Sequence, residues 1–232
     1  MPERRLVAAA AALAASLTGA CALPQRVDGP PRVAQERSGH TVDREVYADL
    51  IRSMLDQGQY YAALAHVQQR RASGGGDRQA LTYLEAEARR GLGQIAAADA
   101  LYQNLLRSSL AGEAYHGLGL LHARTDPARS IGFLREAAKL RPTDADVRND
   151  LGYALLMARR DREALHELAT AVELAPESDK ARNNLLLLMM VQGNETAVNR
   201  ITREAMVPVE TIAHLRQQAR TLNTARTAPG GR

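Results

Sequence analysis

Hydrophobic and polar positions follow the period of an α-helix from Thr41 to about Asn223. No segment in this region shows the two-residue alternation that is expected of a β-strand. Near its end, a one-sided aliphatic stripe is formed by Val209, Ile212, Leu215, Ala219 and Leu222. This pattern predicts an all-α fold whose last helix is amphipathic.

Prolines divide the helical region at a regular interval. Pro142 and Pro176 are 34 residues apart, and each should end the helix before it, because proline has no N–H to continue the hydrogen bonding. The segments 147–157 (VRNDLGYALLM) and 181–191 (ARNNLLLLMMV) align at the same interval. The interval predicts a repeated unit of two helices.

The clearest unit covers residues 145–178. Gly152 and Ala164 are small where the two helices of the unit should cross closely. Asp144 and Asp161 are predicted to cap the first and the second helix, because a carboxylate accepts hydrogen bonds from the free N–H groups of a first turn. Spacing and residue size therefore agree on one register.

The unit 145–178 resembles a tetratricopeptide repeat, although Arg148 and Leu155 replace the usual Trp and Tyr. The matching positions are Leu151, Gly152, Ala164, Leu168, Ala171 and Pro176. The resemblance implies a tetratricopeptide solenoid of about five helix-turn-helix units within 41–207. These units, numbered one to five, cover 44–77, 79–111, 112–144, 145–178 and 179–207. A capping helix over 208–223 and a disordered tail over 224–232 are expected to follow.

The first residues have the pattern of a bacterial lipoprotein signal. Arg4 and Arg5 precede an uncharged apolar run, Leu6 to Leu17, which is too short to span a ~30 Å hydrocarbon core. Small residues then lead to Cys21, the only cysteine of the chain. The pattern resembles a lipobox, although Thr18 stands where Leu is usual.

The resemblance implies a signal peptide over residues 1–20, lipidation of Cys21 and a flexible tether over 21–40 that is rich in proline and polar residues. Ordinary signal cleavage after Ala22 is the alternative. In enteric bacteria, lipoproteins that stay in the inner membrane typically carry Asp after the lipidated cysteine, whereas this chain has Ala22. By that analogy the expected location is the periplasmic side of the outer membrane.

The distribution of charge argues against nucleic-acid binding, and the lack of catalytic motifs in the sequence argues against catalysis. The formal charge is +4, and arginines, which are nearly all of the 30 basic residues, are spread among 26 acidic ones. His166 and Glu167 begin a metalloprotease-like motif, but Thr170 replaces its second histidine. Since no phosphate-binding glycine loop or nucleophile elbow occurs either, we expect no enzyme activity, no cofactor, no metal and no small-molecule substrate.

The resemblance implies that a concave surface, lined by the first helix of each unit, binds a partner protein. In the family, the second, fifth, ninth and twelfth positions of that helix face the groove. The predicted protein-binding residues are Glu113, His116, Leu120, Asp146, Asn149, Tyr153, Leu156, Lys180, Asn183, Leu187 and Met190. We hypothesise that Asn149 and Asn183 hold a peptide backbone, because an amide both donates and accepts hydrogen bonds; retention of solvent-facing residues after duplication is the alternative.

The combination of a lipobox, a tether and about five units resembles the TadD family, the pilus-assembly lipoproteins of the tight-adherence (Flp) system. The resemblance implies a pilotin-like adaptor whose partner is the outer-membrane secretin. Lipoproteins of type IV pilus assembly (PilF/PilW-like) and of outer-membrane protein assembly (BamD-like) have similar layouts. A regulator of cell-wall enzymes or a periplasmic chaperone is a further alternative.

Acylation of Cys21 can be tested directly. Cys21→Ser removes the only thiol, so the variant should incorporate no clickable fatty acid and should leave the membrane fraction or keep its signal. Metabolic labelling followed by gel detection measures this, with the wild-type chain as the reference. Equal labelling of both chains would contradict lipidation at this residue.

Overall fold

The structure, a computed structural model, describes residues 46–227. The predicted signal peptide, Cys21, the tether and the end of the tail, residues 228–232, lie outside that range. All regular secondary structure within 46–227 is helical, so the predicted all-α solenoid of helix pairs is confirmed. None of the helices in this part of the chain is long and apolar enough to cross a membrane.

Eleven helical segments follow one another in the described residues. The first covers residues 46–56. The others are α2 (Tyr60–Ala72), α3 (Arg78–Gly91), α4 (Ile95–Gln103), α5 (Ala111–His122), α6 (Pro127–Leu140), α7 (Ala145–Met157), α8 (Asp161–Leu174), α9 (Asp179–Val191), α10 (Glu195–Glu204) and α11 (Val209–Thr227).

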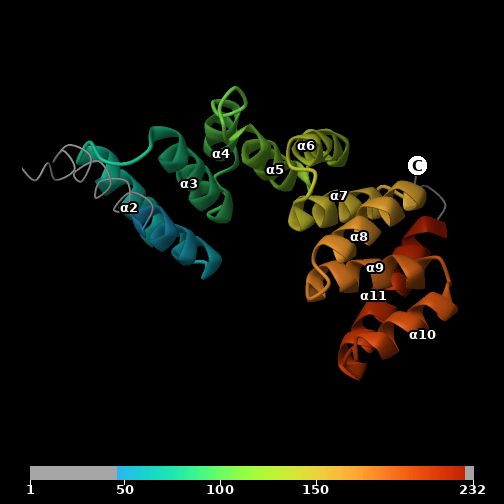
Figure 1. Ribbon diagram of the computed structural model, residues 1–232. Helices are drawn as coiled ribbons and strands as arrows, with labels where there is room; N and C mark the ends of the chain where they lie inside the picture. Colours follow the sequence, from blue (N-terminus) through green and yellow to red (C-terminus); the bar gives the residue numbers. More distant parts are fainter. Residues whose placement is uncertain (1–45, 228–232) are drawn as a thin grey trace, which may run out of the picture. The chain divides into compact units, whose positions relative to one another are not determined.

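Each unit is a pair of neighbouring helices, as the ribbon shows (Figure 1). Unit one joins residues 46–56 to α2, and units two to five are the pairs α3–α4, α5–α6, α7–α8 and α9–α10. The first helix of a later unit also packs on the second helix of the unit before it, as α7 does on α6 and α9 on α8. The apolar core therefore runs from unit to unit, and its largest cluster extends from α6 to α11.

Helix ends follow the predicted signals with one exception. The carboxylate of Asp144 accepts a hydrogen bond from the N–H of Val147 at 3.0 Å, which caps α7. Asp161, in contrast, is the first residue of α8 and caps nothing; Arg160 holds the cap position without a side-chain bond. The capping prediction for Asp161 was wrong because its carboxylate binds Arg226 of α11 instead. The second helices α6 and α8 end two residues before Pro142 and Pro176, as expected.

The two helices of a unit approach closely at a glycine. A Cβ atom on Gly152 would lie 2.6 Å from Cγ of Leu168 and 3.1 Å from its backbone nitrogen. In unit three, Gly119 has the same relation to Leu134, with a Cβ distance of 2.5 Å to Cγ. Since carbon atoms in contact are normally ~3.5–4.0 Å apart, only glycine allows this crossing.

The last helix is longer than predicted. α11 extends to Thr227, so the prediction of disorder was wrong for residues 224–227, which are helical. The additional turn is held by long-range bonds that no local pattern reveals. Arg226 binds Asp161, and Arg159 donates hydrogen bonds to the carbonyl oxygens of Ala225 and Arg226.

The register of unit four can be tested with one substitution at two helical glycines. Gly152→Ala should lower the free energy of unfolding by about 1–3 kcal/mol, because its methyl group would overlap the buried Leu168. Gly132→Ala should raise it by about 0.5–1 kcal/mol, because a Cβ there meets no atom within 4 Å and alanine favours the helix. Urea unfolding followed by circular dichroism measures both changes. Similar changes at both positions would contradict the close crossing at Gly152.

Candidate protein-binding face

The first helices of the five units form one side of the stack, which we call the first-helix face. It comprises residues 46–56, α3, α5, α7 and α9. Every residue predicted to bind a partner lies on α5, α7 or α9. The structure divides this face into an open cleft, a polar network and an end covered by α11.

The cleft lies on units one to three and has a volume of about 350 Å³. Its lining includes Arg52, Leu55, Tyr83, Glu87, Glu113 and Arg141. Glu113 is one of the predicted residues and pairs with Arg141 at 3.3 Å, while Arg141 also binds Asp144 at 2.7 Å. The cleft thus combines an apolar floor with charges of both signs.

A buried hydrogen-bonded group supports the wall of the cleft. The hydroxyl of Tyr102 donates to Glu87, whose second oxygen accepts a hydrogen bond from Arg90 at 2.6 Å. Burial, reinforced by the carboxylate of Glu87, raises the pKa of both Tyr83 and Tyr102 far above its ordinary value. The tyrosines are therefore neutral at physiological pH, and the Tyr83 ring presents an uncharged phenol.

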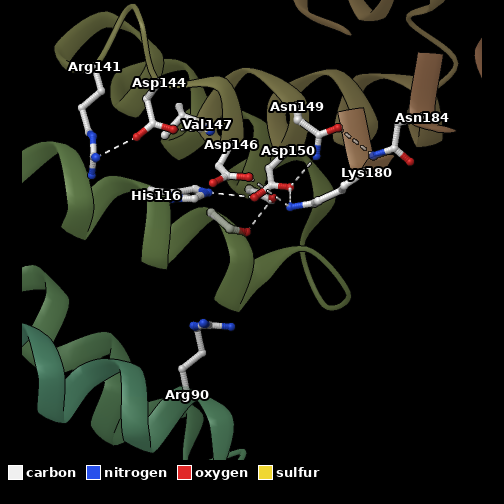
Figure 2. A network of polar contacts seen from close by, with 12 residues as sticks. Arg90, His116, Arg141, Asp144, Asp146, Val147, Asn149, Asp150, Lys180 and Asn184 are labelled. Atoms are coloured by element: carbon white, nitrogen blue, oxygen red, sulfur yellow. Dashed lines mark hydrogen bonds and ion pairs between the residues drawn. The ribbon is translucent and has the colours of Figure 1, made fainter. Parts of the chain in front are cut away.

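The polar network joins α5, α7 and α9 around Asp150 (Figure 2). Nε2 of His116 lies 2.8 Å from one carboxylate oxygen of Asp150, and Nζ of Lys180 lies 2.7 Å from the other. The side-chain amide of Asn149 donates to Asp150 at 3.0 Å, and Asp146 lies 3.9 Å from Lys180. Four of the predicted residues, His116, Asp146, Asn149 and Lys180, therefore meet in the structure.

Asp150 is held in its ionised form. Burial raises the pKa of its carboxyl, but hydrogen bonds and charge from His116 and Lys180 together lower it more, and the pKa lies below its usual range. Only 12% of the Asp150 side chain is exposed, compared with 55% for Lys180. Asp150 therefore ties successive units together, while Lys180 remains accessible from solvent.

The hypothesis for Asn149 was wrong. Its side chain is 1% exposed, and its carbonyl oxygen accepts a hydrogen bond from Asn184 at 2.8 Å. The amide groups of Asn149 are thus used within the chain, in the same relation between successive units that joins His116 to Asp150. Asn183 is half-buried, and its carbonyl oxygen is buried without a hydrogen-bond partner in the described residues.

Three apolar residues predicted to face the groove are covered. Leu156, Leu187 and Met190 are buried, and they belong to the cluster that contains Leu215 and Ala219 of α11. They cannot contact a partner in this state because they are buried, and α11 lies against α9 next to Met190 (Figure 1). Leu120 and Tyr153 remain partly exposed between the network and this covered end.

The sequence analysis missed the part of the site on units one and two. Arg52, Tyr83 and Glu87 occupy the fifth or ninth register positions of their first helices, as His116 and Tyr153 do in later units. The same helix positions in units one and two would have predicted these residues. The repeat pattern of unit two is weak, however, because it has Ala86 where units three and four have Gly119 and Gly152.

The comparisons with known proteins agree with this geometry. No family model matches the chain. It is 38% identical over 223 residues to the TPR repeat-containing protein PA4299 of Pseudomonas aeruginosa, and the match covers 94% of this chain and 86% of the relative. The chain belongs to the tetratricopeptide-repeat (TPR) family. Because the match spans most of both chains, the likeness extends beyond a single repeat unit.

Solved TPR structures share the fold at low sequence identity. TTC0263 of Thermus thermophilus matches with a TM-score of 0.60 and 16% identity, over 77% of this chain and 98% of that one. MamA of Desulfovibrio magneticus RS-1 matches with a TM-score of 0.54 and 17% identity, over 70% and 93%. YrrB, described as a TPR protein with an unusual peptide-binding site, matches with a TM-score of 0.51 and 16% identity, over 81% and 97%.

The network predicts how stability depends on pH. The folded-state pKa of Asp150 lies below its unfolded value, so the ionised carboxylate stabilises the fold above that unfolded value, ~3.9. This stabilisation is lost as the pH falls through the folded-state pKa. Asp150→Asn should therefore lower the free energy of unfolding by about 1–3 kcal/mol at neutral pH and reduce its loss below about pH 4.

Urea unfolding between pH 3 and 7 measures both effects. Asp146→Asn is the matched control, because Asp146 is exposed and lies only near Lys180. A wild-type and an Asp150→Asn chain that lose stability in parallel on acidification would show that Asp150 does not hold the units together.

Proposed function

We propose that the protein is a non-enzymatic TPR adaptor which binds a segment of a partner protein in the cleft of units one to three. The observation that carries the proposal is the cleft itself, about 350 Å³ in volume and built by three successive first helices. No residue of 46–227 fills it, whereas α11 covers the other end of the first-helix face.

The lining of the cleft indicates the chemistry of the partner segment. Leu55 offers an apolar floor above the buried Leu84, Tyr83 a neutral phenol, and Arg52 and Glu113 opposite charges at the rim. A short peptide with one aliphatic or aromatic side chain and flanking charges of both signs would satisfy these groups. A stack of units does not need one strong contact, because several weak contacts along such a segment add up to the affinity.

Membrane attachment is the second part of the proposal. Acylated Cys21 would hold the protein on the periplasmic side of the outer membrane, with the tether between the lipid and unit one. Two or more acyl chains give stable attachment, since each buried CH₂ contributes ~0.8 kcal/mol. Confinement to the same membrane as the partner would raise its effective concentration, so a weak contact would be sufficient.

We place this adaptor in assembly of Flp pili by the tight-adherence system, as a pilotin-like TadD-type lipoprotein that acts on the secretin. The support is the combination of lipobox, tether and five units, together with a cleft suited to a peptide. A secretin is an outer-membrane assembly with segments in the periplasm, where this proposal locates the cleft.

Binding can be tested by reversing one charge on the cleft. Arg52→Glu should weaken capture of the secretin about tenfold. Arg52 is expected to pair with an acidic residue of the partner segment, and a glutamate in its place would repel that residue. Arg107→Glu is the matched control, since Arg107 is exposed and does not line the cleft. Pull-down from detergent-solubilised membranes, with the amount of secretin quantified, measures the effect.

Two results would contradict the proposal at different levels. Wild-type capture by Arg52→Glu would show that the cleft is not the binding site. Normal secretin multimers and pili in a strain that lacks the gene would show that the protein serves another envelope assembly.

A further inference from the structure

The last helix covers a surface that the family register assigns to partner binding. α11 packs against α9, and its aliphatic residues Leu215 and Ala219 join the cluster that contains Leu187 and Met190. Asn223 donates a hydrogen bond to the carbonyl oxygen of Val191, the last residue of α9. α11 therefore crosses the end of the first-helix face rather than leaving it open to solvent.

The end of α11 is held by a reciprocal pair of arginines. Arg226 donates two hydrogen bonds to the carboxylate of Asp161, each 2.8 Å long, and one to the carbonyl oxygen of Leu156, also 2.8 Å. In return, Arg159 donates to the carbonyl oxygens of Ala225 and Arg226, at 2.8 and 3.1 Å. We call the side chains of Arg159, Asp161 and Arg226 the clasp; it connects the last turn of α11 to the turn between α7 and α8.

The backbone at Arg159 shows that the clasp is retained at a cost. The turn between the two helices of units one, two and five contains Gly58, Gly93 and Gly193, with φ of 72°, 71° and 69°. Arg159 occupies the same register position in unit four with φ of 60°, a conformation that glycine adopts freely but that is unfavourable for a residue with a Cβ atom, apart from Asn and Asp. Glycine would be the better residue for the turn, but glycine could not bind the end of α11.

Few residues of α11 are buried. Only Leu215 and Ala219 are buried along its 19 residues, while Ile212 and Leu222 are partly covered. The connection from α10 contains Met206, which is 86% exposed and also has a positive φ, 48°. Few apolar contacts and a strained connection favour local opening of this helix before the rest of the stack.

We propose that α11 closes a second helix-binding surface, on the ends of α7 and α9, and that an amphipathic helix of a partner protein replaces α11 there. The surface beneath α11 is formed by α9, with Met190 next to Ala219, and by the carbonyl oxygen of Leu156 at the end of α7, with the Asp161 carboxylate and Arg159 at its edge. The proposal rests on the proposed function in treating the first-helix face as the side that binds partners.

The chemistry of the partner follows from the helix that occupies the surface. In α11, Ile212, Leu215, Ala219 and Leu222 lie on one side of the helix, and Arg226 follows one turn later. A replacing helix therefore needs small or aliphatic residues at that spacing and an arginine near its C-terminal end. A helix without the arginine would leave Asp161 without its cation.

Opening of α11 can be measured on the purified full-length chain carrying Cys21→Ser. In this background Met190→Cys introduces a thiol beneath α11, and Ala171→Cys introduces a control thiol in the core of α8. Arg226→Ala should accelerate labelling by Ellman's reagent at position 190 about tenfold, and leave labelling at 171 unchanged. Equal rates at position 190 with and without Arg226 would overturn the clasp.

Two variants of Arg159 distinguish loss of the clasp from a general loss of stability. Arg159→Gly should accelerate labelling at position 190 as Arg226→Ala does, yet should not lower the melting temperature, because glycine relieves the backbone strain. Arg159→Ala removes the same hydrogen bonds but keeps the strain, so it should melt at a lower temperature than Arg159→Gly. A melting temperature that falls equally in both variants would contradict strain at this turn.

Replacement by another helix is tested in trans. A chain ending at Pro208 should be stabilised by a synthetic peptide of residues 209–227, measured as a rise in melting temperature, and not by a scrambled peptide. The same peptide with Arg226→Ala should bind about tenfold more weakly. If the shortened chain does not fold, the peptide is titrated into the Arg226→Ala chain that carries Met190→Cys, and slower labelling at position 190 is the signal, because a bound peptide covers the thiol as α11 does.

The helix-binding surface would be contradicted if the peptide neither raised the melting temperature of the shortened chain nor changed the labelling rate of the Arg226→Ala chain. These measurements use no pilus component. They therefore stand apart from the secretin pull-down, and failure of either proposal can be recognised without the other.

Discussion

Each helix pair in this protein can bury its apolar residues only against the next pair. A unit of about 34 residues has no core of its own, so its stability comes from contact with its neighbours, and small residues at the crossing points make that contact possible. Gly119 and Gly152 leave room for the side chains of Leu134 and Leu168, so that the two helices of each unit can cross closely. The order and spacing of everything on the surface follow from this stacking.

Polar contacts between successive units use the same register. His116 reaches Asp150 in the next unit, and Asn184 reaches back to Asn149. A carboxylate as buried as that of Asp150 is tolerated only because three neighbours bind it, so the network also specifies how units three, four and five align. The same bonds remove Asn149 from the set of residues that a partner could reach.

The first-helix face therefore has unequal parts. The cleft on units one to three is open and lined by charges of both signs, whereas the surface of α7 and α9 beneath α11 is apolar and closed. Binding of a helix at the covered surface would require α11 to leave, whereas the cleft is open in the same state. Arg159 has an unfavourable backbone conformation at a turn position where units one, two and five have glycine, and the hydrogen bonds of the clasp account for the arginine.

The sequence by itself determined the helix pairs, their register and most of their ends. Local signals were sufficient for these: the helical period, the carboxylate of Asp144 before a first turn, and the prolines after α6 and α8. The family register placed His116, Asp146 and Lys180 on the first helices of their units, and the structure brings these three side chains together around Asp150. It could not show which side chains on that face are exposed, because burial depends on elements distant in the chain.

Only the tertiary structure decided how the ends of the first helices are used. Leu156, Leu187 and Met190 have the register of groove residues, but they are buried in the core of the last units, where α11 folds back against α9. Asp161 has the sequence context of a helix cap, yet it binds Arg226, 65 residues later. Contacts of that sequence separation leave no periodic trace, because they depend on where a whole helix packs and not on the residues beside it.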